Sequence, residues 1–310
     1  MKRILNIVNH RDSVLVMALV FGLIMGERIR PLADISMWSL AFVMVFSTTG
    51  FTFRSWIPVS NMLRPLAISL FLNYVVFGLT IIGLSWIFFH ESYFPFFAGL
   101  VLIAAAPPGP SVIPFSTLID GDTSFSVTGV FGLHLLAMLL TPLILLIILG
   151  QALINPVEIF WIMARLILIP LVISRLLRHP RILPGVEKVR NTAVKWGFFL
   201  VVSPIVGMSV PVLQSEPLFV LKISGLIFFA MFVMGSLYHY LMVIMRKGRG
   251  FIISSTLMMV IKSSAFAAVA AFRFFPDDPR VALPSAVVSV FVTLFIIFYS
   301  MLVRLSGLKK

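Results

Sequence analysis

Residues 100–130, LVLIAAAPPGPSVIPFSTLIDGDTSFSVTGV, decide how this chain is expected to fold. The stretch begins as an apolar helix and meets Pro-Pro-Gly-Pro at residues 107–110. A proline lacks a backbone N–H, and its ring clashes with the carbonyl four residues earlier, so this run stops a helix. Inside a bilayer the freed backbone groups need partners from protein or from a water-filled cavity. Helices broken at membrane depth commonly form the binding sites of secondary transporters, so we expect a binding site here.

The composition indicates a membrane protein. Of the 310 residues, 60% are hydrophobic and 11% are charged, and the mean hydropathy is +1.10. A soluble core cannot use so much apolar surface, so we expect an all-α polytopic protein in a lipid bilayer. The net charge of +13 comes from basic residues spread over short loops, which excludes a nucleic-acid groove.

Several functional classes lose support from what the sequence lacks. The chain has no cysteine, which excludes disulfides, thiolate metal sites and cysteine nucleophiles. It also has no HExxH, GxSxG or P-loop motif and no pair of carboxylates within an apolar stretch. We therefore expect neither an enzyme nor a metal or cofactor site.

Ten apolar stretches approach the roughly 20 residues that a membrane-spanning helix needs. They are residues 13–30, 36–53, 65–89, 94–118, 124–149, 157–177, 192–212, 218–245, 251–273 and 281–304. Most lysines and arginines fall at the two ends of the chain and in the even-numbered loops. This bias predicts that both termini are cytoplasmic and that the protein lies in the cell (inner or plasma) membrane.

A long polar connection at about residues 178–195 divides the stretches into two groups of five. An odd number of spans per half requires opposite insertion, which predicts two inverted five-helix repeats at residues 1–154 and 155–310. The fourth span is broken at residues 107–110, and the ninth carries Lys262-Ser263-Ser264 in its middle. Interrupted spans at matching places predict that the two breaks cross at mid-membrane and form the binding site.

Lys262 is the main candidate for binding at this crossing. A lysine at the centre of a membrane helix costs on the order of 2.5–3.5 kcal/mol, so it should face a cavity or a partner. Its partners could be carbonyls of the broken fourth span or a substrate anion. A lysine that releases and rebinds a proton could instead couple transport to protons.

Other candidates are small residues or carry a hydroxyl or amide within an apolar stretch. They are Ser263, Ser264, Gly109, Pro110, Ser111 and Asn73. Asn73 could equally join two helices. A half-helix that starts after Pro110 would direct its positive end towards the break and favour an anion there.

Four further features are expected to be structural. Residues 47–50 (Ser-Thr-Thr-Gly) favour packing, residues 120–122 (Asp-Gly-Asp) favour a turn, and His134 favours a hydrogen-bonded core position. Arg165, near Glu158 in the sixth span, is expected to reach the interface by snorkelling, with a functional role as the alternative.

At the level of motifs, residues 107–128, PPGPSVIPFSTLIDGDTSFSVT, resemble the fourth-span signature of the bile acid:sodium symporter family. That signature runs Pro-Gly-Gly-x-x-Ser-Asn, then Gly-Asp or Gly-Asn, then Leu-Ser-Val. Residues 42–53, FVMVFSTTGFTF, are similar to its second-span Met-Phe-x-Met-Gly-Leu pattern, and residues 262–271, KSSAFAAVAA, to its ninth-span Gln-Asn-Ser-Gly-Leu-Ala stretch. The resemblance implies a transporter in which the first, second, sixth and seventh spans form a panel that moves against a core.

The chain departs from the family where the resemblance implies sodium binding. The corresponding positions are Val112, Ile113, Ser126, Val130 and Met258. Among these side chains a hydroxyl is kept at Ser126, whereas the others are apolar, and Lys262 stands where the family has glutamine. We hypothesise that the Lys262 ammonium replaces sodium as a tethered cation.

The sequence therefore predicts a secondary transporter of a small organic anion that works by alternating access without sodium, either by facilitated transport or with protons. One alternative is a sodium-coupled symporter for organic or bile-acid-type anions. The other is a membrane sensor or assembly protein that keeps the fold and transports nothing.

Overall fold

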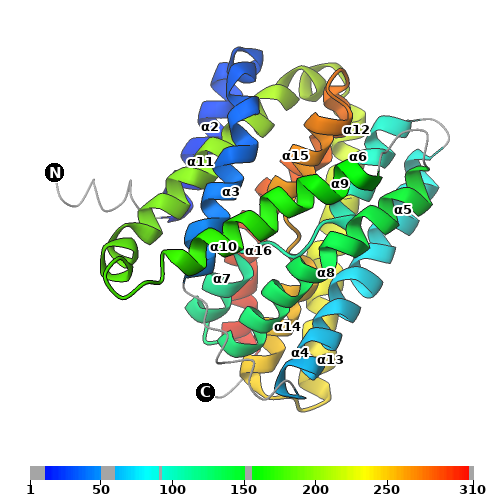
Figure 1. Ribbon diagram of the computed structural model, residues 1–310. Coiled ribbons are helices and arrows are strands. Elements are labelled where there is room, and N and C mark those ends of the chain that lie inside the picture. Colours follow the sequence, from blue (N-terminus) through cyan, green and yellow to red (C-terminus); the bar gives the residue numbers. More distant parts are fainter. Residues whose placement is uncertain (1–10, 50–59, 91–92, 151–155, 307–310) are drawn as a thin grey trace.

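The computed structural model describes residues 11–49, 60–90, 93–150 and 156–306. Within these ranges the ordered elements are helices, and an isolated antiparallel bridge joins Pro108 to Lys262 (Figure 1). The expected all-α class is confirmed. The ends of the chain and Gly50 lie outside the described residues.

In the first half the helices follow the expected stretches. They are α2 (Arg11–Met25) with the 3₁₀ turn η1 (Gly26–Leu32), α3 (Ala33–Thr49), α4 (Ser60–Leu70), the π-helical η3 (Phe71–Gly78), α5 (Leu79–Phe89), α6 (Phe94–Ala105), α7 (Val112–Leu118) and α8 (Thr123–Leu149).

The second half also contains long and interrupted helices. Its elements are α9 (Pro156–Met163), the π-helical η4 (Ala164–Leu168), α10 (Ile169–Leu176), α11 (Leu183–Ser215), α12 (Pro217–Phe228), the π-helical η5 (Phe229–Val233), α13 (Met234–Ile244), α14 (Arg249–Val260), α15 (Ser264–Phe274), the 3₁₀ turn η6 (Pro279–Val281) and α16 (Leu283–Leu305).

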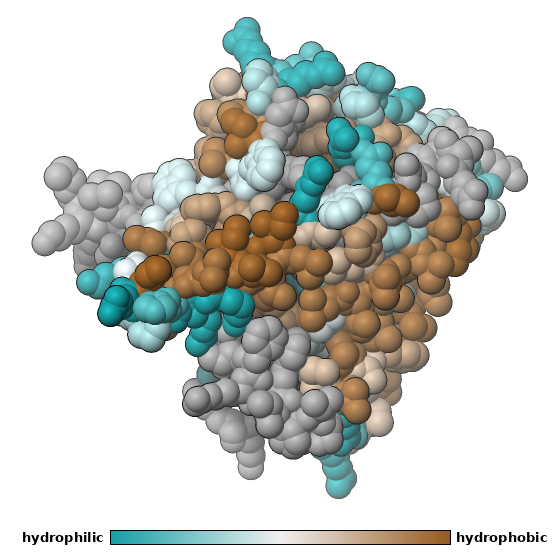
Figure 2. Space-filling model, in the orientation of Figure 1, coloured by the Kyte–Doolittle hydropathy of each residue, from teal (hydrophilic) through white to brown (hydrophobic). Residues whose placement is uncertain are grey.

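The surface of the protein suits a bilayer. Among the described residues, 5 helices are long and apolar enough to cross a membrane by length and composition. Large apolar side chains such as Ile24, Ile87 and Ile244 are about three-quarters exposed, and Figure 2 shows apolar residues in a broad region between more hydrophilic ends. Such a surface is stable against lipid but not against water. The chain is a multi-pass membrane protein, and the count of ten spans stays a prediction.

One expectation about the middle of the chain is wrong. The polar connection predicted at residues 178–195 is largely helical, because α11 begins at Leu183. Pro184 occupies the first turn, where its missing N–H costs nothing, and Val186 is buried on the inner face of the first turns. The seventh helix therefore extends beyond its apolar stretch into a polar segment.

Helices α2, α3, α10 and α11 pack on one another and form one side of the molecule, here called the panel (Figure 1). Close approach of α2 and α11 depends on glycine: a Cβ at Gly22 would lie 2.5 Å from the Ser203 carbonyl, and one at Gly207 would lie 2.8 Å from the Gly26 carbonyl. The other helices surround α6 and α14 and are here called the core group. The panel contains the first, second and seventh expected spans and the C-terminal part of the sixth, and its movement against the core group stays a prediction.

The two helical interruptions meet inside the core group. The Gly109 N–H donates to the Ile261 carbonyl (3.1 Å), and the Ser263 N–H donates to the Pro107 carbonyl (2.9 Å). Extended backbone at Ile261 follows α14, and Ser263 restarts α15 as an N-cap that accepts from the Phe266 N–H at 3.3 Å. Backbone groups freed at each break are thus satisfied partly by the other break, as burial requires.

The residues expected to be structural behave as such. Asp122 caps α8 by accepting from the Phe125 N–H (2.9 Å), and its own N–H donates to the Gly250 carbonyl (2.9 Å). His134 is buried, and its Nδ1 lies 2.7 Å from the Val130 carbonyl oxygen. These contacts confirm the predicted turn and the predicted hydrogen-bonded core histidine.

Two other expectations concern the ends of helices. Thr48 and Thr49 donate to carbonyls of their own helix, which confirms packing there. Arg165 is exposed in η4, and its neighbour in sequence Glu158 pairs with Arg273 at 2.9 Å. The snorkelling of Arg165 to the interface stays a prediction.

Candidate functional site

Lys262 is held by three oxygen atoms where the two breaks meet. Its Nζ donates to Asn73 Oδ1 (2.8 Å), the Ala104 carbonyl (2.8 Å) and the Ala106 carbonyl (2.9 Å). The residue is 2% exposed. An ammonium group has three N–H donors and no acceptor, so these three oxygens satisfy it completely.

The proline run explains why two of these oxygens are available. In a continuous helix the Ala104 carbonyl would accept from residue 108 and the Ala106 carbonyl from residue 110, four positions later. Both positions are proline and have no N–H. The end of α6 therefore presents unpaired carbonyls, and its dipole adds partial negative charge there.

The third oxygen comes from the π-helical segment η3. Asn73 Oδ1 accepts from Lys262, while its Nδ2 donates to the Met258 carbonyl at 2.9 Å. The next residue, Tyr74, places its ring 4.2 Å from the Lys262 Nζ, which is within cation–π range. The π-helical segment thus directs the consecutive side chains of Asn73 and Tyr74 towards one ammonium group. Of the two roles considered for Asn73, joining helices is the one that its contacts display.

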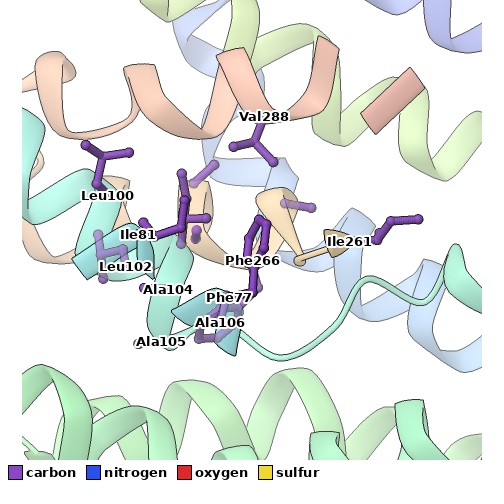
Figure 3. Packing of buried hydrophobic residues seen from close by; sticks show 14 of the residues in the cluster. Phe77, Ile81, Leu100, Leu102, Ala104, Ala105, Ala106, Ile261, Phe266 and Val288 are labelled. Carbon is purple, nitrogen blue, oxygen red and sulfur yellow. The ribbon is translucent and has the colours of Figure 1, made fainter. Parts of the chain in front are cut away.

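The surroundings of this polar group are apolar. Figure 3 shows Phe77, Ala104, Ala105, Ala106, Ile261 and Phe266 packed around the break. Among the described residues, the carboxylates that form salt bridges pair with arginines and not with Lys262. A positive charge in such a setting acts strongly on any anion nearby, because a low local dielectric screens it little.

A cavity lies beside the break, between the core group and the panel. It encloses about 510 Å³ of empty space, counting the space at its open side. It is lined by Gly109, Pro110, Ser111, Phe115, Phe198, Val202, Lys262, Ser263, Ser264, Ala265, Ser289, Val292 and Thr293. Of this, a water-sized sphere can reach about 60 Å³, so the closed part of the cavity is small in this conformation.

The structure brings most of the predicted binding residues together. Six of the seven candidates line the cavity, and Asn73 is the one that does not. The second break approaches Gly109 closely, because a Cβ there would lie 3.1 Å from Ile261 Cγ2 and 3.3 Å from the Lys262 carbonyl. Since α7 has seven residues, its N-terminus contributes less than the sequence suggested.

Sequence reasoning missed the walls supplied by α11 and α16. Phe198 and Val202 come from α11, whereas Ser289, Val292 and Thr293 come from α16. A signal was present, because hydroxyl residues recur every four positions in residues 285–293, SAVVSVFVT. That spacing puts them on one face of a helix.

The positions implied to bind sodium are mostly apolar and buried. Val112, Val130 and Met258 are at most 2% exposed, and Ile113 is partly buried. Met258 occupies space beside Gly129, where an added Cβ would lie 2.6 Å from Met258 Cε. Ser126 keeps a buried hydroxyl without a hydrogen-bond partner in the described part of the chain. The side chains at these positions do not fit a sodium ion, which prefers several hard oxygen ligands.

Comparison with known proteins gives one match. The model of the sodium bile acid symporter family matches residues 37–215, from α3 to the end of α11. No curated protein that was compared matches the chain. The match includes the first break and leaves out the second break with Lys262.

Proposed function

Because the chain belongs to the sodium bile acid symporter family, we propose that it transports a small organic anion and does not use sodium. The observation that carries this proposal is the coordination of the Lys262 ammonium by three oxygens at 2.8–2.9 Å. These oxygens form a cation-binding arrangement in which the cation is covalently part of the protein. A fixed cation supplies the positive charge that a co-transported ion would otherwise bring.

An anionic substrate follows from the charge of the site. The cavity lining contains one charged residue, Lys262, and no carboxylate. A unit charge roughly 8 Å from a bound anion contributes about 2 kcal/mol at an effective dielectric constant of about 20. That energy corresponds to about a 30-fold gain in affinity.

Facilitated transport is favoured over proton coupling by the geometry around the lysine. A neutral amine has two N–H groups and a lone pair, so one of the three oxygens would face that lone pair. The three short contacts therefore suit the charged form. Proton coupling through Lys262 stays the alternative within this proposal.

The architecture supports alternating access by two inverted repeats, residues 1–154 and 155–310, with ten spans. The third and eighth expected spans both contain a π-helical segment, η3 and η5, and the fourth and ninth are both interrupted. The cavity has walls from the panel and from the core group, so relative movement of these groups would change its access.

Cytoplasmic termini in a cell membrane complete the proposal. Loops expected on the same side of the membrane meet in space: Asp120 lies 3.6 Å from Arg249, and Glu158 lies 2.9 Å from Arg273. The first pair belongs to the expected cytoplasmic side and the second to the opposite side. The topology inferred from positive charges is consistent with both contacts.

Uptake into proteoliposomes tests the proposal. The protein is reconstituted and supplied with labelled organic anions in sodium buffer, in choline buffer, and with or without a pH gradient. We expect uptake that is equal in sodium and choline, and Lys262→Gln should lower the apparent affinity about 30-fold. Lys222→Gln is the matched control, because Lys222 is exposed above the Phe219 ring.

Three outcomes would overturn parts of this reading. Loss of uptake in choline would support the sodium-coupled alternative, for which the orphaned hydroxyls of Ser69 and Ser126 would be the remaining ligands. Unchanged uptake by Lys262→Gln would remove the role of the fixed cation. Absence of both binding and uptake for every anion would support a membrane sensor or assembly protein.

A further inference from the structure

Three hydroxyl side chains of α16 lie along one face of the helix. Ser285, Ser289 and Thr293 are spaced by four residues, so they lie one turn apart. Ser289 and Thr293 line the cavity, whereas the Ser285 hydroxyl is fully buried and has no hydrogen-bond partner within the described residues. The hydroxyls of Ser289 and Thr293 are therefore the ones on this face that a ligand in the cavity could reach.

The hydroxyls of this face can change partners. Ser289 Oγ lies 2.9 Å from both Ser264 Oγ and the Ser285 carbonyl. A hydroxyl has one hydrogen, so Ser289 donates to one of these acceptors at a time. The Thr293 hydroxyl lies 3.4 Å from the Ser289 carbonyl, at the limit of a hydrogen bond. Rotation of these groups would direct donors into the cavity without breaking a strong network.

Lys262 has no free hydrogen-bond donor for a ligand in the cavity. All three hydrogens of its ammonium point to Asn73, Ala104 and Ala106. Its charge therefore attracts an anion at a distance, while direct contacts must come from hydroxyl groups. One fixed charge neutralises one carboxylate, and a second carboxylate would lose its hydration without compensation.

The remaining wall is apolar. Phe115, Phe198, Val202 and Val292 face the same cavity. Side chains of this kind bind a hydrocarbon body and contribute through the apolar area that they remove from water.

We propose that Ser264, Ser289 and Thr293 bind the carboxylate of a small monocarboxylate whose hydrocarbon part packs on Phe198 and Val292. The inference rests on the proposed function and names its substrate class. It also makes α16 the element that determines specificity. A sulfonate or phosphate monoester offers similar charge but a larger head group with three terminal oxygens.

Direct binding to the purified full chain tests the proposal. The probes are straight-chain monocarboxylates of increasing length and benzoate, each compared with its primary amide, with a dicarboxylate such as phthalate and with the matching sulfonate. We expect at least one monocarboxylate to bind about tenfold more tightly than its amide, its dicarboxylate and its sulfonate. Isothermal titration calorimetry measures each affinity.

Variants then locate the contact. Ser289→Ala with Thr293→Val should weaken monocarboxylate binding more than tenfold, because it removes two hydrogen bonds to a charged group and the loss of each costs about tenfold or more. Ser300→Ala is the matched control on α16, since Ser300 does not line the cavity and its hydroxyl donates to the Ile297 carbonyl. Unfolding temperatures equal to that of the wild type show that the variants are folded.

The outcomes separate this inference from the proposed function. If the wild type binds a monocarboxylate and the double variant binds it equally well, α16 does not hold the carboxylate. If the wild type binds and transports only sulfonates or dicarboxylates, the substrate class is wrong while anion transport stands. If no anion binds or is transported, both proposals fail.

Discussion

Replacement of Asn73 by leucine tests the coordination of Lys262 independently of any substrate. Asn73 is fully buried and accepts from the Lys262 Nζ while donating to the Met258 carbonyl. Leucine is of similar size and can make neither hydrogen bond. One ammonium hydrogen and one carbonyl oxygen would then be buried without partners.

The expected cost follows from these two contacts. A hydrogen bond to a charged group contributes about 1.5–3 kcal/mol, and one between neutral groups about 0.5–1.5 kcal/mol. Because the groups left behind cannot reach water, the sum should lie near the upper end, roughly 3–4.5 kcal/mol. For a protein of this size that destabilisation lowers the unfolding temperature by about 10 °C.

Thermal unfolding of the purified protein, followed by tryptophan fluorescence, measures the effect. Asn73→Asp keeps an acceptor for Lys262 and loses the donor to Met258, so its unfolding temperature should fall less. Ser85→Ala is the control: Ser85 is also buried and lies in α5, which follows η3 directly, but its hydroxyl donates to the Ile82 carbonyl of its own helix. If Asn73→Leu unfolds within about 2 °C of Ser85→Ala, the ammonium does not depend on Asn73 and the reasoning is refuted.

Two further predictions concern packing and a charged turn. Gly99→Ala should destabilise the fold by about 1–3 kcal/mol, because its Cβ would lie 2.3 Å from the Val281 carbonyl. Gly83→Ala is the control and should be neutral or stabilising, because the space around Gly83 is open. Equal unfolding temperatures for the two variants would contradict this prediction. The hydrogen bond from Arg280 holds the pKa of the Asp278 carboxylate below its ordinary value. Asp278 therefore stabilises the fold at pH values above its unfolded pKa of about 3.9, and this contribution is lost as the pH falls through the lower folded value. The difference in unfolding temperature between the wild type and Asp278→Asn should be small and constant above about pH 5, and it should shrink below about pH 4. A difference that grows in acid would contradict the stabilising role of the Asp278 carboxylate.

The positions of the two breaks were accessible from the sequence because their causes are local. Prolines at residues 107–110 have no N–H to donate, and no neighbouring context can restore the missing hydrogen bonds. The structure shows that Ser263 caps the helix that follows the second interruption, a role that was not predicted from the sequence. The family resemblance added the grouping into panel and core, which periodicity alone does not supply.

The site itself depended on contacts between distant parts of the chain. Lys262 reaches Asn73 across 189 positions and Ala104 across 158. The sequence left three possibilities open for this lysine: backbone carbonyls as partners, a substrate anion as partner, or release of its proton. Residue types alone do not distinguish between them. Only the packing of η3 and α6 around the second break selects carbonyls and an amide.

The sequence by itself determined that this chain is an apolar, all-helical membrane protein with interruptions in two helices. Composition and missing N–H groups have these effects whatever the rest of the chain does. The tertiary structure decided what those interruptions do. It directs the unpaired carbonyls of α6 to Lys262 and places Ser289 and Thr293 of α16 beside Ser264. Such contacts depend on how helices far apart in the sequence pack, and local patterns of residues do not specify that geometry.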